Sequence, residues 1–94
     1  MKQSYGFLEV TGYAAALKCA DIMIKTAYIT ISHMERIGSG LVTIMIEGDL
    51  ASVQAAIEAG IESAESSLLT ANVIARPYEG FLNVTNQTKE GSDG

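Results

Sequence analysis

Strand-like and helix-like spacings of apolar residues follow one another along the chain in a definite order. This order constrains the fold more than any single motif does. Segments typical of β-strands span 5–11, 28–35, 41–47 and 68–75. Apolar residues at helical spacing follow the first and the third of these strands, at 13–27 and 53–64. The predicted order is β-α-β-β-α-β. With right-handed crossovers it places both helices on one face of an antiparallel four-stranded sheet, the ferredoxin-like arrangement of the α+β class.

Each predicted helix has one apolar stripe. In the first helix the inner stripe consists of Tyr13, Ala16, Leu17, Ala20, Ile24 and Ala27, while Asp21 and Lys25 form an i,i+4 pair on the opposite face. Asp49 is predicted to be the N-cap of the second helix. The inner stripe of that helix consists of Val53, Ala56, Ile57, Gly60, Ile61 and Ala64. A glycine inside a helix costs about 1 kcal/mol relative to alanine, so Gly60 predicts a close approach of helix and sheet.

The segment 41–47, LVTIMIE, is apolar on both faces of its strand. The two helices can cover only one of these faces. The other face needs cover from a short C-terminal segment at 78–82 or from a neighbouring subunit, because an exposed apolar patch is costly in a monomer. We therefore expect a single domain at 1–82 that forms a homo-oligomer, followed by a polar, loose tail at 83–94.

Composition excludes several classes of function. Among the 94 residues, 6 Lys and Arg stand against 11 Asp and Glu, and the net charge of −5 argues against nucleic acid as a partner. The single cysteine, Cys19, cannot form an internal disulfide, and no cluster of Cys and His has metal-ligand spacing. We expect no metal and no cofactor. The start of the chain lacks a signal-peptide core and no apolar run is long enough for a membrane span, so a cytoplasmic location is expected.

Four segments carry a resemblance to a known family: GFLEVTG at 6–12, ALKCADIMIKTA at 16–27, ERIGSGLVTIMIEGDLASVQAAIEAG at 35–60 and VIARPY at 73–78. The chain resembles the bacterial microcompartment shell proteins, specifically the kind with a single BMC domain that forms hexamers. The resemblance implies six-membered tiles that assemble with other shell proteins around encapsulated enzymes. It also implies a central pore through which small metabolites pass.

The resemblance also implies roles for individual residues. The loop Gly38, Ser39 and Gly40 matches the pore loop, with Ser39 at the narrowest point and Arg36 near the pore mouth. Glycines on either side of Ser39 let the backbone approach the axis and favour polar or anionic solutes. Without this context, Gly-Ser-Gly between two strands is simply a hairpin turn.

A second set of residues matches the edge at which tiles meet. Lys25 matches the edge lysine, and Arg76 matches the arginine that inserts across the seam between tiles. Tyr28 stands at the tile edge, where close relatives usually carry a small polar residue, and Asp49 completes the predicted edge set. Taken alone, such charged residues are most often solvated.

The sequence offers little support for catalysis. His33 is predicted to be a packed or interface residue, and Cys19 a small buried apolar group rather than a nucleophile. The alternative to a shell protein is a ferredoxin-like regulatory module that senses a small molecule as a dimer or trimer. An acylphosphatase-like enzyme would need an arginine near the first strand, and residues 6–15 contain none.

Overall fold

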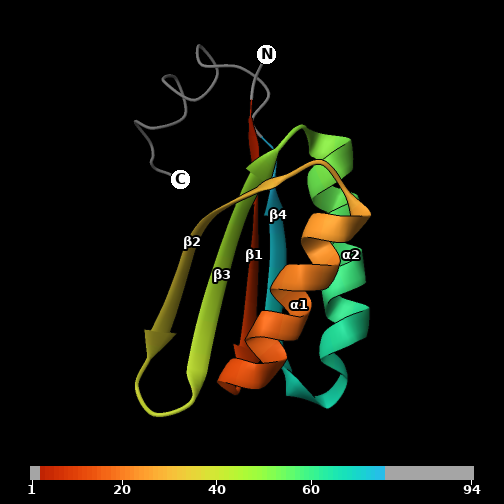
Figure 1. The fold of residues 1–94 in the computed structure, drawn as a ribbon. Coiled ribbons are helices and arrows are strands. Elements are labelled where there is room, and N and C mark those ends of the chain that lie inside the picture. The colour runs from red at the N-terminus through yellow and green to blue at the C-terminus, as the bar shows by residue number, and fades with distance from the viewer. Residues whose placement is uncertain (1–2, 76–94) are drawn as a thin grey trace, which may run out of the picture.

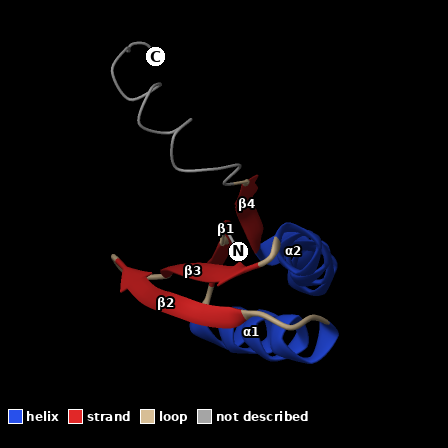
Figure 2. Ribbon diagram, turned by 90° about the horizontal axis from the view of Figure 1, so that it is seen from above, coloured by secondary structure: helices blue, strands red, loops and turns tan. Residues whose placement is uncertain are grey.

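The computed structural model describes residues 3–75, which form one sheet and two helices. Along the chain the elements are β1 (Ser4–Thr11), α1 (Tyr13–Thr26), β2 (Thr30–Ile37), β3 (Leu41–Gly48), α2 (Leu50–Ala64), a 3-10 turn (Glu65–Ser67) and β4 (Leu68–Ile74). The strands lie in the order β2-β3-β1-β4 with every neighbouring pair antiparallel. Both helices cover the same face of the sheet (Figures 1 and 2). The predicted α+β, ferredoxin-like fold is confirmed.

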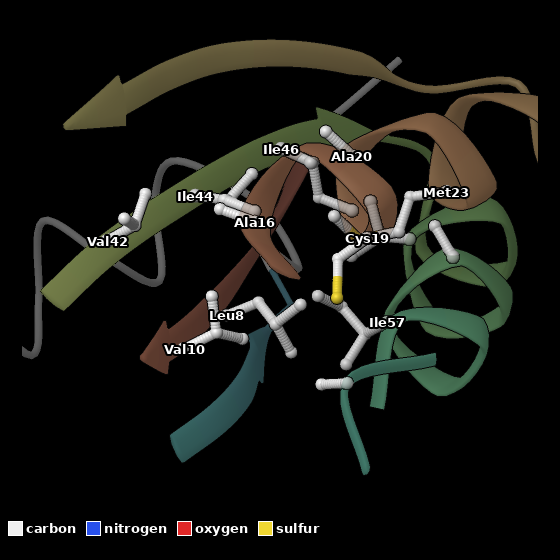
Figure 3. Close-up of a cluster of buried hydrophobic side chains, with 13 residues drawn as sticks. Leu8, Val10, Ala16, Cys19, Ala20, Met23, Val42, Ile44, Ile46 and Ile57 are labelled. Atoms are coloured by element: carbon white, nitrogen blue, oxygen red, sulfur yellow. The ribbon is translucent and has the colours of Figure 1, made fainter. Parts of the chain in front are cut away.

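The core lies between this sheet and the two helices. Alternate residues of β3 (Val42, Ile44 and Ile46) point into it and are almost fully buried. Side chains of α1 and α2 meet them there together with Leu8 and Val10 of β1 (Figure 3). Because side chains of a strand alternate between its two faces, one face of β3 forms the core and the other lies on the open side of the sheet.

The buried face of α1 differs from the predicted stripe. Ala16 and Ala20 are buried as expected, but Tyr13, Leu17 and Ile24 are exposed. Cys19 and Met23 are buried in their place. The reason is that α1 packs against α2 as well as the sheet, and the thiol of Cys19 donates a hydrogen bond to the carbonyl of Gly60 at 3.5 Å. The prediction that Cys19 is a small buried group is confirmed.

In α2 the predicted stripe is buried except for Ile61, which is exposed. Gly60 provides the predicted close approach. A Cβ atom at this position would lie 3.0 Å from side-chain atoms of both Leu8 and Met23, so α2 can sit this near to β1 and α1 only without a side chain there.

The second strand begins two residues later than predicted, at Thr30, and ends two residues later, at Ile37. Residues 27–29 instead form the connection from α1, in which the amide of Ala27 donates to the carbonyl of Met23 and the amide of Ile29 to that of Ala27. Tyr28 lies in this connection rather than in the strand.

The open face of the sheet carries apolar side chains, as predicted from the third strand. Leu41 and Met45 of β3 are half-buried, and Ile74 of β4 is exposed. Within residues 3–75 no helix packs on this face (Figure 2). The proposed covering segment at 78–82, the boundary at residue 82 and the tail at 83–94 lie outside the described residues.

Gly6 is a second point of close contact between β1 and α2, and it yields a prediction about stability. A Cβ atom at Gly6 would lie 2.7 Å from Cγ1 of Ile57. We expect Gly6→Ala to lower the free energy of unfolding by about 1–3 kcal/mol, because the overpacked core must shift. The measurement is urea denaturation at a fixed protein concentration.

The control is Gly40→Ala, where an added Cβ meets nothing within 4 Å. This variant should not lose stability. A Gly6→Ala protein as stable as the wild type would contradict the packing described here.

Candidate functional site

The loop Gly38–Gly40 is a three-residue turn that joins β2 to β3 at one end of the sheet. All three residues are exposed. Gly38 has φ +65°, a backbone conformation that side-chain-bearing residues rarely adopt. The amide of Gly12 donates a hydrogen bond of 2.7 Å to the carbonyl of Gly40. This bond ties the loop to the corner between β1 and α1.

A hollow of about 180 Å³ lies beside this loop. Its walls are Gly12, Tyr13, Arg36, Gly38, Ser39, Gly40, Leu41 and Val42. The four residues predicted for the pore therefore line one site. Arg36 reaches it because it pairs with Val42 across β2 and β3, on the parity that faces the helices.

Tyr13 also lines this hollow, which the sequence does not predict. The guanidinium carbon of Arg36 lies over the Tyr13 ring, 4.8 Å from its centroid. Tyr13 follows Gly12 directly and begins α1, and its side chain is 45% exposed. Its position in the apolar pattern predicted a core residue, and nothing in the local sequence indicates a contact with a residue 23 positions later.

Two of the predicted edge residues lie at the other end of β3. Tyr28 and Asp49 line a hollow of about 340 Å³ together with Gln3, Ile29, Thr30, Glu47 and Gly48. Tyr28 is 93% exposed and is the most exposed large hydrophobic side chain of the described residues. The structure thus brings two of the four edge residues together.

The other two edge residues are placed differently. Lys25 does not line this hollow; it lies in the last turn of α1, where its ammonium group forms an exposed ion pair of 2.9 Å with Asp21. Arg76 lies outside the described residues. Asp49 has a local role as well, because its carboxylate caps α2 by accepting from the amide of Ser52 at 2.9 Å.

The remaining polar side chains that could act chemically are not grouped. His33 is exposed on the edge strand β2, where its ring contacts the carboxylate of Glu35 at 3.0 Å. It is therefore not packed within the subunit, and its alternative role as an interface residue stays a prediction. Burial raises the pKa of the Cys19 thiol, an effect opposed by a hydrogen bond with Ser63 and by the charge of Lys18.

Within residues 3–75 there is no group of three or more His, Cys, Asp or Glu suited to a metal ion. No helix in the same range has the length and apolar character that crossing a membrane requires.

Comparison with known proteins identifies the family. The family model of the BMC domain matches residues 4–77. The chain belongs to the BMC domain family. Among its relatives, bacterial microcompartment shell protein PduK of Salmonella typhimurium is 54% identical, with 87% of this chain aligned to 53% of that protein. The chain therefore spans about half the length of PduK.

Two further relatives extend the comparison. Carboxysome shell protein CcmK2 of Synechocystis is 41% identical, and the alignment covers 86% of this BMC domain protein and 82% of CcmK2. A crystal structure of a microcompartment protein from Desulfitobacterium hafniense superposes with a TM-score of 0.77 at 29% identity. That match covers 82% of this chain and 44% of the other.

The capping role of Asp49 yields a prediction. Asp49→Ala removes the acceptor for the Ser52 amide, so we expect the free energy of unfolding to fall by about 0.5–2 kcal/mol. Asp49→Ser retains a capping oxygen and should keep most of the stability. Chemical denaturation of the three proteins measures the difference. Equal stability of the Ala and Ser variants would show that the cap contributes nothing here.

Proposed function

We propose that the chain is a structural shell protein of a bacterial microcompartment that assembles into six-membered tiles with a central pore. One observation carries this proposal: the loop with Ser39 and the hollow with Tyr28 lie at opposite ends of β3. A tile needs its pore residues at one end of each subunit and its outer-edge residues at the other. The names of the relatives support the same role, since PduK and CcmK2 are shell proteins.

Two features of the subunit surface suit contact with neighbouring subunits. Within residues 3–75, strand β2 lies at the edge of the sheet and pairs only with β3, so its outer backbone groups are open to a further partner. Tyr13, Leu17 and Ile24 form an exposed apolar flank along α1. An apolar flank and an unpaired edge are together costly in a monomer and favourable in a ring of identical subunits.

The proposed pore is selective for small polar or anionic solutes. Six copies of the loop place Ser39 around one axis, and glycines on both sides keep side chains out of the opening. Arg36 adds a positive charge near each copy of the loop, although the whole chain carries a net charge of −5. A local field of this kind raises the concentration of anions at an opening.

The tiles are proposed to enclose metabolic enzymes in the bacterial cytoplasm, together with other shell proteins. In this proposal the protein has no chemistry of its own, since it holds neighbours and controls passage.

The pore loop provides the first test. Sedimentation equilibrium of the wild type should give six times the 9.9 kDa mass of the chain. Ser39→Leu should give the same mass but reduce conductance across a planar layer of the assembled protein in potassium acetate, because a bulky apolar group narrows each copy of the loop. Ser39→Ala is the size-matched control and should conduct like the wild type.

A mass of two or three subunits would favour the regulatory module instead. If Ser39→Leu formed a ring of six with unchanged conductance, the loop would not line the pore.

The edge residues provide a separate test. We expect Lys25→Ala to leave the six-membered ring intact and to prevent its growth into sheets, because Lys25 is proposed to contact the next tile. Electron microscopy of the assemblies measures this. Lys18→Ala removes another exposed lysine from the same helix and serves as the matched control. Equal loss of sheets in both variants, or in neither, would contradict an edge role for Lys25.

A further inference from the structure

Arg36 is held at the hollow beside the loop in an arrangement that leaves its charge available. Its guanidinium lies over the ring of Tyr13 at 4.8 Å from the centroid. Within residues 3–75 no carboxylate lies within 4.0 Å of it. A guanidinium has five N–H donors in its plane, and a ring contact covers only a face of that plane. The donors at the edge thus remain free for another partner.

The hollow combines polar donors with an aromatic ring. Arg36 and the hydroxyl of Ser39 supply polar donors, and within the described residues that hydroxyl has no hydrogen-bond partner. The half-exposed ring of Tyr13 supplies aromatic surface. The volume of about 180 Å³ suits a molecule of a few heavy atoms.

We infer that each subunit has a subsite here for a small carboxylate, and that Tyr13 is the positioning residue for Arg36 in it. The planar fork of Arg36 matches the two oxygens of a carboxylate. The inference rests on the proposed pore for its role in passage. All of its donors, however, belong to a single chain.

Tyr13 acts through Arg36 in two ways. The ring attracts the cation and restricts a long, flexible side chain, so less conformational entropy is lost when a carboxylate binds. The neighbouring amide of Gly12 holds the carbonyl of Gly40 at 2.7 Å, so the same corner of the fold fixes both the loop and the ring. The arrangement of the subsite therefore depends on the first residue of α1.

The test uses acetate and acetamide, which share a shape and differ in charge. Each is titrated at constant ionic strength against the 94-residue chain, and NMR shifts of the Arg36 Nε–H and of the Gly38 and Gly40 amides report binding. Acetate should bind at least about tenfold more tightly than acetamide, because hydrogen bonds between two charged groups are the stronger ones. Arg36→Gln should abolish this discrimination.

Variants of Tyr13 separate positioning from general stability. Tyr13→Leu should weaken acetate binding about two- to fivefold, the value of an exposed contact between a guanidinium and a ring, and should increase the mobility of the Arg36 Nε–H. Tyr13→Phe retains the ring and should bind within about twofold of the wild type, given that contact. Tyr28→Leu makes the same change at the far end of β3 and should leave acetate binding unchanged.

Two results would overturn the subsite: acetamide binding as tightly as acetate, or wild-type affinity and Arg36 mobility in Tyr13→Leu. Sedimentation in the same buffer measures the oligomeric state, and so distinguishes failure of the subsite from failure of the six-membered tile. A monomer that discriminates acetate from acetamide would support the subsite and contradict the six-membered tile. A ring of six without discrimination would contradict the subsite alone.

Discussion

Burial of one face of β3 against the helices is the interaction on which the rest of the structure depends. Val42, Ile44 and Ile46 fill the centre of the core, and β3 is hydrogen-bonded on both sides, to β1 and to β2. A slip of one residue in this strand would move all three side chains to the open face, so its register is strongly determined. Both hollows gain their geometry from this strand, because each lies at one of its ends.

The open face of the sheet is more varied than its apolar residues alone indicate. The carboxylate of Glu9 on β1 accepts from the hydroxyl of Thr43 on β3 at 3.2 Å and from that of Thr70 on β4 at 3.3 Å. These bonds join three strands with a polar row between apolar neighbours such as Phe7 and Met45. A surface of this kind limits non-specific association while it still leaves apolar area for a specific partner.

The sequence predicted the element order, the sheet and the N-cap at Asp49, because periodicity and capping depend on nearby residues. It predicted the face of α1 only in part. Two apolar faces of this helix lie side by side, and only the packing of α2 at Gly60 decides that Cys19 is buried while Leu17 is exposed. The contact of Arg36 with Tyr13 is not predicted from the sequence for a related reason. It depends on how the end of β2 meets the start of α1, and the local spacing of residues carries no such information.

The grouping of Gly38, Ser39, Gly40 and Arg36 could be expected from a family resemblance, and the structure adds Tyr13, whose ring contacts Arg36. At the opposite end, Tyr28 and Asp49 come together because the connection from α1 passes beside the end of β3, a contact that the sequence alone does not reveal.

The length of β3 has a consequence for any lattice built from this domain. Eight residues at about 3.3 Å each separate the loop from the far hollow by roughly 25 Å. In the proposed tile this span contributes to the distance between the opening and the border. A subunit with a longer or shorter third strand would present its loop and its border at a different separation.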